Sequence, residues 1–316
     1  MLFTVYKTAT GLSTTTELEQ LALTDAAQVV WIDLFNTAPD ERDLIEAKFN
    51  IELFTRQEAE EIESSSKYFE NGDEINANST YIFHRDGLYA NDPVSFILKG
   101  NLLVTQRNIE LRSFDEVIRS FRLGKRPHIN GYHIFLLLFE TRIDIEADFL
   151  EDLSRKIHAA SKSLTLSKRL DQDVLIEINQ LQELIILFRQ STSEMQRLIS
   201  ALLKSDIFPH DEREKLRVII KDAGSLLEHT SFNFARLESL QNTFLGLVDM
   251  EQNRIIKIFT VATVVFMPPT LIASLYGMNF QFMPELKWHI GYPFALFLMV
   301  LSSTSTLLYF KRRNWL

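Results

Sequence analysis

Two long apolar stretches without charge dominate the hydrophobic pattern of the C-terminal part of the sequence. The first runs from Ile258 to Leu275 and the second from Tyr292 to Phe310. Each approaches the roughly 20 apolar residues that a helix needs to cross about 30 Å of hydrocarbon. The pattern therefore predicts two transmembrane helices, at 255–276 and 291–311, joined by a short loop at 277–290.

The charges that flank these stretches predict their orientation. Basic residues stand on the side away from the loop, at Arg254, Lys257, Lys311, Arg312 and Arg313. The loop itself carries one acid, Glu285, and one base, Lys287. Because basic residues gather on the cytoplasmic side of a membrane, we expect both termini in the cytoplasm and the loop outside. The N-terminal residues show no secretory signal pattern, so the large N-terminal part is expected to stay in the cytoplasm, and 312–316 forms a basic cytoplasmic tail.

Short runs of β-branched and aromatic residues indicate a mixed α/β domain over 1–130. The predicted strands are Phe3–Lys7, Val29–Leu34, Thr80–His84, Val94–Leu98 and Leu102–Gln106. A tight hairpin is expected at Lys99-Gly100-Asn101. A helix start is predicted at 36–40, and apolar spacing predicts further helices at Glu58–Ser64 and Phe114–Leu123.

Longer helical patterns follow this domain. Apolar residues recur every three or four positions over 131–210, which predicts two long antiparallel helices that turn near Ser163–Ser167. Their charged residues are expected on solvated faces. A third helix is predicted to start near Asp211, with acids in its first turn, and no firm stop signal appears before Gly277. Its part at 211–254 would be a stalk that continues into the first membrane span.

The amino-acid composition limits the kinds of site and partner that the chain can have. The chain has 316 residues, a formal net charge of −9 and no cysteine, which rules out disulfides and thiolate metal sites. An acidic balance is compatible with a divalent cation as partner, although a solvated acidic surface explains it equally well, and nucleic acid is not expected as a partner. Neither a phosphate-binding glycine loop nor a paired-histidine motif is present, so an enzyme is not predicted.

A polar stripe runs along one side of the first predicted span. Its members fall within about one third of the helix circumference at about 100° per residue: Asn253, Ile256, Phe259, Thr260, Thr263, Met267, Thr270 and Ser274. The opposite side is expected to carry Val261, Val264, Val265 and Leu271. The stripe indicates either packing between helices or the wall of a water-filled pore. Because two helices cannot enclose a pore, the second interpretation requires an oligomer with the first spans around its axis.

Two consecutive prolines, Pro268 and Pro269, stand inside this span. Since proline has no N–H, the carbonyls near Val264 and Val265 lose their partners in the helix and need water, another helix or a cation. The span is expected to bend there. Ile256, Phe259 and Met267 are candidates for hydrophobic constrictions that gate by losing water. The second span, with its Ser302–Thr306 run, is expected to pack outside the first through small residues.

The loop carries a family resemblance. The run YGMNF at Tyr276–Phe280, followed by FMPELKW at Phe282–Trp288, resembles bacterial members of the CorA family of magnesium and cobalt transporters that carry a GMN motif. FMPPT at Phe266–Thr270 and the tail KRRNWL at Lys311–Leu316 are also similar to that family. The close resemblance covers about the last seventy residues. The order of an α/β domain, long helices, stalk and two spans fits the plan of the family.

The resemblance implies a homopentameric, channel-like importer in the bacterial inner (plasma) membrane, driven by the electrochemical gradient and gated by cytoplasmic Mg²⁺. Gly277, Met278 and Asn279 would then form an outer ring, and Asn279 would bind the cation through its hydration waters. Magnesium releases water reluctantly, so amide and hydroxyl groups suit a hydrated ion. Glu285 would raise the cation concentration at the mouth, or alternatively it would pair with Lys287 within the loop. The resemblance also implies regulatory Mg²⁺ sites in the cytoplasmic part, which the sequence does not place.

Two alternatives remain open at this stage. The same fold could carry Co²⁺, Ni²⁺ or zinc instead of Mg²⁺, although zinc prefers nitrogen and sulfur ligands and the histidines are scattered. A membrane-anchored coiled-coil scaffold or sensor would also contain long helices. In every case the expected partners are the lipid bilayer and further copies of the same chain, and for a transporter also divalent cations.

Overall fold

The computed structural model describes residues 1–9, 11–61, 67–85, 88–123, 129–166 and 172–313. These residues form two compact units, and helix α7 contributes to both. The first unit holds the described residues up to Leu240, and the second holds those from Gln241 to Arg313.

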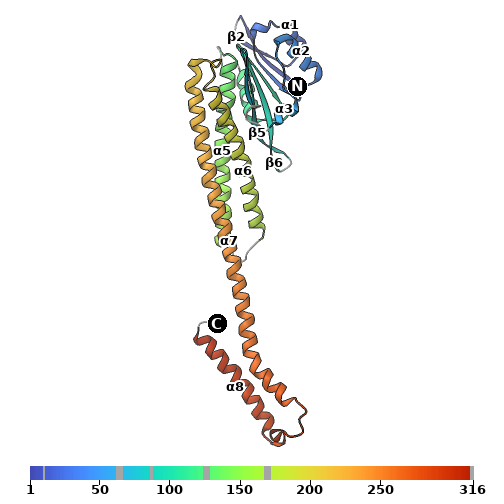
Figure 1. Cartoon of the computed structure of the whole chain (residues 1–316), viewed down its shortest axis with the longest axis vertical. Helices are drawn as coiled ribbons and strands as arrows, with labels where there is room; N and C mark the ends of the chain where they lie inside the picture. The colour runs from blue at the N-terminus through green and yellow to red at the C-terminus, as the bar shows by residue number, and fades with distance from the viewer. Residues whose placement is uncertain (10, 62–66, 86–87, 124–128, 167–171, 314–316) are drawn as a thin grey trace. The chain divides into compact units, whose positions relative to one another are not determined.

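A seven-stranded sheet forms the centre of the first unit (Figure 1). The strands follow the spatial order β2-β1-β3-β7-β6-β5-β4. All neighbours are antiparallel except β3 and β7, which run parallel. Their bounds are β1 Leu2–Thr8, β2 Gly11–Thr15, β3 Val29–Phe35, β4 Tyr68–Asn71, β5 Glu74–Arg85, β6 Leu88–Lys99 and β7 Leu102–Arg107.

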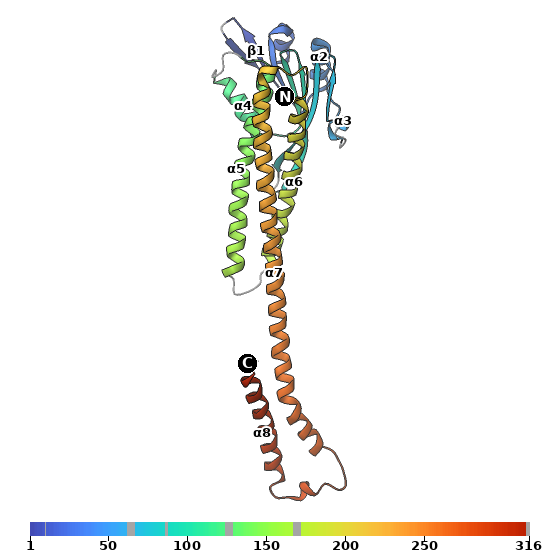
Figure 2. The same ribbon diagram turned by 60° about the vertical axis from the view of Figure 1, so that its left-hand side comes forward.

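Helices cover both faces of the sheet (Figures 1 and 2). Short helices lie on one face: α1 Leu18–Leu23, α2 Pro39–Phe49 and α3 Arg56–Glu60, with a 3-10 turn, η1, at Ala26–Gln28. The other face carries α4 Arg112–Arg122, α5 Gly131–Leu166 and α6 Gln172–Leu202. Alternation along the strands explains the three layers, since successive residues point to opposite faces. Ile32 thus joins the core under α2, whereas its neighbour Trp31 contacts Phe114 of α4.

Gly131 brings the start of α5 against the β6–β7 hairpin. Its N–H donates to the Asn101 carbonyl oxygen at 2.7 Å. A Cβ at this position would lie 2.6 Å from the backbone of Leu102, so only glycine allows this approach. The hairpin itself turns through Gly100, whose φ of +55° belongs to the left-handed region. The predicted tight turn at Lys99-Gly100-Asn101 is confirmed, with Lys99 paired to Leu102.

Several sequence-based predictions need correction. The strands expected at Thr80–His84 and Val94–Leu98 are only the C-terminal halves of the 12-residue strands β5 and β6. The helix predicted at Glu58–Ser64 ends at Glu60 as α3, and residues 62–64 lie outside the described residues. Strands β2 and β4 and helix α1 were not predicted, because their apolar runs are short and interrupted by polar residues.

The long helices follow the predicted pattern more closely. α5 continues to Leu166, through most of the turn expected at Ser163–Ser167, and Ser167 lies outside the described residues. α7 runs from Arg213 to Tyr276 without interruption, preceded by a 3-10 turn, η2, at His210–Glu212. In the first unit, α7 is tied to both neighbours: Asn233 Nδ2 donates to Ser154 Oγ of α5 at 2.9 Å, and Gln196 Nε2 of α6 donates to the Ile220 carbonyl at 3.2 Å.

A buried arginine joins the sheet to α5 and α6. Arg142 of α5 is 2 % exposed, and its Nε donates to Glu146 Oε1 at 2.7 Å. Its other nitrogens donate to the Ser79 hydroxyl, the Thr80 carbonyl and the Ser191 hydroxyl, at 2.9, 2.9 and 2.7 Å. The expectation that the helix charges lie on solvated faces is therefore wrong for this pair. A guanidinium has five donors in a fixed fork, and here they bond to three elements at once.

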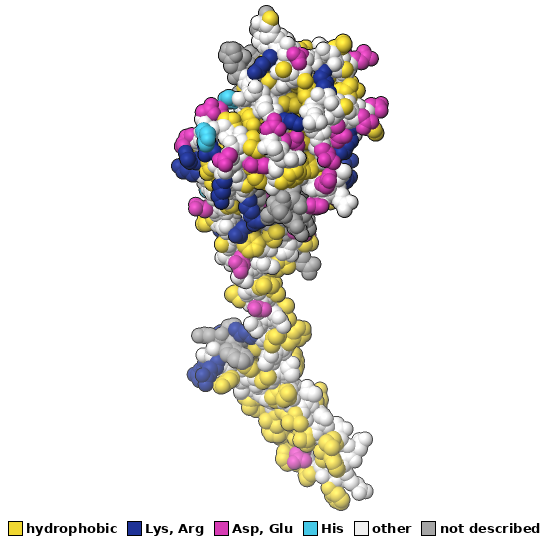
Figure 3. Space-filling view, turned by 45° about the horizontal axis from the view of Figure 1, so that its top comes forward, with side chains coloured by type: hydrophobic (Ala, Val, Ile, Leu, Met, Phe, Trp, Pro, Cys, Tyr) yellow, Lys and Arg dark blue, Asp and Glu magenta, His cyan; other side chains and the backbone are white. Residues whose placement is uncertain are grey.

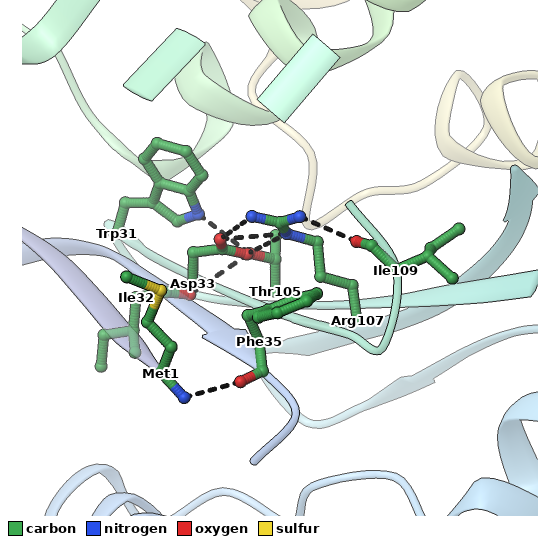
Figure 4. A network of polar contacts seen from close by, with 8 residues as sticks. All are labelled: Met1, Trp31, Ile32, Asp33, Phe35, Thr105, Arg107 and Ile109. Atoms are coloured by element: carbon green, nitrogen blue, oxygen red, sulfur yellow. Dashed lines mark hydrogen bonds and ion pairs between the residues drawn. The ribbon is translucent and has the colours of Figure 1, made fainter. Parts of the chain in front are cut away.

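A second buried ion pair joins β3 to β7 (Figure 4). Arg107 Nη2 lies 2.9 Å from Asp33 Oδ2, and Thr105 Oγ1 donates to Asp33 Oδ1 at 2.7 Å. Trp31 Nε1 donates to the same threonine hydroxyl at 3.1 Å. Asp33 of β3 is thus bound by the Arg107 guanidinium and the Thr105 hydroxyl, both on β7. These bonds link β3 to β7, the one parallel pair among the described strands.

The second unit consists of the C-terminal part of α7, the connecting loop and α8 Gly291–Arg312. Val261 and Val265 of α7 form a small buried cluster with Phe310 of α8. Most other large apolar side chains of this unit are exposed, and Figure 3 shows them as a largely uncharged hydrophobic surface. An exposed apolar surface of this extent indicates contact with lipid or with other copies of the chain. Two helices, α7 with η2 and α8, are long and apolar enough to cross a membrane.

Candidate ion pathway

The predicted pore-lining residues share an unpacked side of α7. All are exposed: Asn253, Ile256, Phe259, Thr260, Thr263, Met267, Thr270 and Ser274. At about 100° per residue, Val261 and Val265 lie on the opposite side of the helix. That side is packed on α8. Val264 and Leu271 were also expected on that opposite side, but the same repeat places them beside the stripe, and they are 36 % and 65 % exposed, so the expectation is wrong for both. The stripe is therefore left open for water or for another copy of α7.

The threonine hydroxyls of the stripe present acceptors. Thr260 Oγ1 donates to the Ile256 carbonyl at 2.8 Å, and Thr263 Oγ1 donates to the Phe259 carbonyl at 2.9 Å. Thr270 Oγ1 makes the same kind of bond about two turns further along, to the Phe266 carbonyl. A hydroxyl has one proton and two lone pairs, so a hydroxyl that donates to its own helix offers only its lone pairs outward. Waters that hydrate a cation direct their protons outward and need such acceptors.

The proline pair breaks the hydrogen bonding of α7 next to this stripe. Pro269 has no N–H for the Val265 carbonyl, and Pro268 has none for Val264. Ser303 Oγ of α8 lies 3.4 Å from the Val265 carbonyl oxygen and donates to it. One of the two carbonyls is therefore served by the neighbouring helix. The sequence predicted the loss of the helix bond but did not identify its replacement.

The GMN residues follow directly on the end of α7. The N–H of Gly277 donates to the Ala273 carbonyl at 2.9 Å, and that of Met278 donates to the Leu275 carbonyl at 3.4 Å. A Cβ on Gly277 would lie 3.1 Å from the Ala273 oxygen, which is a tight approach. The side chain of Asn279 is exposed, and among the described residues it has no hydrogen-bond partner. Its amide is free to bind water.

The rest of the loop is anchored to the start of α8. A 3-10 turn, η3, at Pro284–Lys287 packs on Gly291, where a Cβ would lie 2.4 Å from the Glu285 carbonyl oxygen. Within the described part of the chain, no ion pair joins Glu285 to Lys287. The carboxylate of Glu285 is thus not neutralised by the nearest basic residue of the loop.

The cytoplasmic part was expected to hold regulatory cation sites. In the residues that the structure describes, no three acidic or histidine side chains come together as a metal-ligand set. Within the acid-rich stretch of 60–74, Glu74 is buried and lies 3.6 Å from Lys99 Nζ. Glu60 pairs with Arg56 at 2.6 Å. The solvated acidic surface that would explain the net charge therefore does not include Glu74.

A family model described as "CorA-like Mg²⁺ transporter protein" matches residues 26–312. The chain belongs to this family. The match extends the resemblance from the last seventy residues to nearly the whole chain, including the stalk and the α/β domain. The protein is thus a member of a transporter family, with two helices that can span a membrane.

Curated relatives named as magnesium transport proteins align with this chain over most of their length. The chain is 39 % identical to a magnesium transport protein CorA of Wolinella succinogenes over 297 residues, which cover 92 % of each chain. It is 37 % identical to a magnesium transport protein CorA of Escherichia coli K12 over 308 residues, which cover 95 % of this chain and 96 % of the relative. A solved structure of the CorA magnesium transporter from Methanocaldococcus jannaschii matches with a TM-score of 0.87 at 18 % identity, over 100 % of this chain and 99 % of that one. This CorA likeness confirms the fold class of an α/β domain, a long helix and two membrane helices.

Proposed function

We propose that this CorA-family chain carries Mg²⁺ across a membrane through a pore formed by several copies of α7. One observation supports this most directly. The hydroxyl and amide stripe is exposed on the side of α7 that faces away from α8, and it leads to the GMN residues at the helix end. Copies that meet along this stripe would enclose a polar path, and their α8 helices would face outward.

The proposed outer site consists of Gly277, Met278 and Asn279 from each copy. Asn279 binds the hydration waters of the cation rather than the bare ion, because Mg²⁺ keeps its waters in most protein sites. Its amide carries no charge, so a bound ion can leave again. Glu285 and its counterparts attract cations to the mouth.

Inside the proposed pore, Thr270, Thr263 and Thr260 continue the series of acceptors, and Asn253 ends it. Between them, Ile256, Phe259 and Met267 are exposed apolar side chains that would face the same axis. Rings of such side chains close a narrow pore by expelling water. These three positions form the gate in our proposal.

The driving force is the membrane potential. A divalent cation gains roughly 4.6 kcal/mol per 100 mV, which is twice the single-charge value. We place both termini in the cytoplasm of a bacterial cell and the GMN loop outside its inner membrane, since Arg254, Lys257 and Lys311–Arg313 lie at the opposite ends of both helices from the loop. Five copies, and regulatory Mg²⁺ bound between their cytoplasmic parts, complete the proposal.

Uptake by purified protein in vesicles tests this function. A Mg²⁺-sensitive dye trapped inside should report influx that grows with an inward negative potential. Co²⁺ and Ni²⁺ should compete for the same path. Zinc influx that excess Mg²⁺ leaves unchanged, together with absent Mg²⁺ influx, would contradict the assignment.

A further inference from the structure

The Val265 carbonyl is the point at which the hydrogen bonding of α7 is broken on its packed side. In an α-helix this oxygen would accept from the N–H four residues later, and that residue is Pro269. Val265 itself is buried against α8. Within a bilayer no bulk water reaches such an oxygen, so it needs a donor from protein.

Ser303 supplies that donor. Unlike the neighbouring hydroxyl residues, it donates to α7 and not to its own helix. Ser302, Thr304 and Thr306 each donate to a carbonyl of α8 itself, at 2.8, 2.7 and 2.9 Å. Ser303 Oγ instead donates across to Val265 of α7 at 3.4 Å. A hydroxyl in a helix has the option of bonding back to its own preceding turn. The bond from α8 to α7 therefore goes to the Val265 carbonyl, the carbonyl on the packed side for which α7 has no N–H donor.

The bond lies between two parts of the proposed pore wall. Thr260, Thr263 and Met267 precede Pro269, whereas Thr270 and Ser274 follow it. The ribbon of α7 changes direction in its C-terminal part (Figures 1 and 2), as a helix does where proline removes a bond. The angle between the two parts decides whether the stripe faces one axis throughout. A contact that holds the helix at the break thus sets the alignment of the polar groups on either side.

We propose that Ser303 is a positioning residue of the pore, which holds the bend of α7 by donating to the carbonyl that Pro269 leaves free. Ser303 does not touch the ion. Its effect on transport rests on the proposed function, whereas the bond itself does not.

A double-mutant cycle in reconstituted vesicles tests the role. Ser303→Ala should lower the maximal Mg²⁺ influx several-fold with little change in the concentration for half-maximal influx, because the outer site is unchanged. Ser303→Thr keeps the hydroxyl and should restore influx. Ser302→Ala removes a hydroxyl that bonds within α8 and should leave influx unchanged. Pro269→Ala gives the helix its own N–H donor to the Val265 carbonyl. In a protein that carries Pro269→Ala, the further change Ser303→Ala should therefore leave influx nearly unchanged.

A nuclear magnetic resonance measurement tests the bond without transport. The sequence contains a single Val-Phe step, Val265-Phe266, so ¹³C-carbonyl valine with ¹⁵N-phenylalanine isolates this one carbonyl. A carbonyl carbon resonance moves downfield when its oxygen accepts a hydrogen bond. In the assembled wild-type protein in lipid, Ser303→Ala should therefore shift it upfield, and Ser302→Ala should not.

Two results would overturn the proposal. The first is a Val265 resonance that Ser303→Ala does not move. The second is a loss of influx on Ser303→Ala that is equally large with and without Pro269, since this would indicate ordinary packing. If the wild-type protein carries no Mg²⁺, the proposed function fails, and the resonance still decides whether the bond exists.

Discussion

Thr270 Oγ1 lies 2.7 Å from the carbonyl oxygen of Phe266, to which it donates its only hydroxyl proton. The same side chain is exposed on the side of α7 that α8 leaves open. Like the equivalent bonds of Thr260 and Thr263, this bond makes the hydroxyl an acceptor toward the proposed pore, because the oxygen then presents lone pairs and no proton. A wall of acceptors suits a cation that keeps its water shell.

Replacing Thr270 by valine should lower Mg²⁺ influx several-fold without loss of the folded assembly. Valine has nearly the same shape but offers no lone pairs, and a missing hydrogen bond to a hydration water costs about 0.5–1.5 kcal/mol. Thr270→Ser should retain influx. The matched control is Thr304→Val, which removes an exposed hydroxyl of α8 that also bonds to its own helix. Influx and oligomer size are the measurements, and equal losses at both positions would argue against an acceptor role.

Gly291→Ala should alter the affinity of the outer site. The added Cβ would lie 2.4 Å from the Glu285 carbonyl oxygen, so the loop that bears Glu285 has to move. We expect the concentration for half-maximal Mg²⁺ influx to rise several-fold. Gly246→Ala is the control, because nothing lies within 4 Å of a Cβ there. An unchanged concentration dependence in Gly291→Ala would mean that the loop geometry does not matter to ion entry.

The Arg142–Glu146 pair should be the most sensitive polar contact of the first unit. Arg142→Met leaves the buried Glu146 carboxylate without its cation and removes the donor to the Ser79 and Ser191 hydroxyls, and breaking a buried pair costs about 3–5 kcal/mol. Thermal unfolding of the full chain in detergent should therefore begin roughly 6–20 °C lower. Arg155→Met removes an exposed arginine that pairs with Glu151 and should change the midpoint little. A small effect of Arg142→Met would contradict the account of this network.

The lowered pKa of Glu194 predicts that the folded protein loses stability in acid. Burial raises the pKa of this carboxyl, but hydrogen bonds from Lys67 and Thr80 outweigh burial and lower the pKa below the usual 4.5. A carboxyl whose pKa is lowered on folding stabilises the protein above its unfolded pKa, and this contribution is lost as pH falls through the folded pKa. The midpoint temperature of unfolding should thus decrease as the pH is lowered below about 4.5. In Glu194→Gln this decrease should be smaller. Glu151→Gln, at an exposed position, should not change it.

The two helices of the second unit could be predicted from the sequence because their signals are local. Two uncharged runs of helical length, a proline pair and the GMN loop each depend on neighbouring residues only. The uninterrupted helix from Arg213 to Tyr276 also followed from the absence of a stop signal. The orientation of the stripe relative to Val261 and Val265 could be worked out from the helical repeat alone.

Contacts between distant residues could not be predicted in the same way. Arg142 reads as one charged residue among many on a long helix, and only the packing of β5 and α6 around it makes it buried. Asp33 and Arg107 are 74 positions apart and meet because β3 and β7 are parallel neighbours. Ser303 lies in a run of small polar residues, and nothing in that run indicates which hydroxyl crosses to α7.

The central claim is that Asn279 binds a hydrated Mg²⁺ at the entrance of a pore. Mg²⁺ influx into vesicles that contain Asn279→Ala protein tests it most directly, with the assembly checked by its size in detergent. The account predicts that influx falls to the level of empty vesicles while the assembly is unchanged, and that Mg²⁺ influx in the wild type rises with the inward potential. An Asn279→Ala protein that carries Mg²⁺ at the wild-type rate would contradict it.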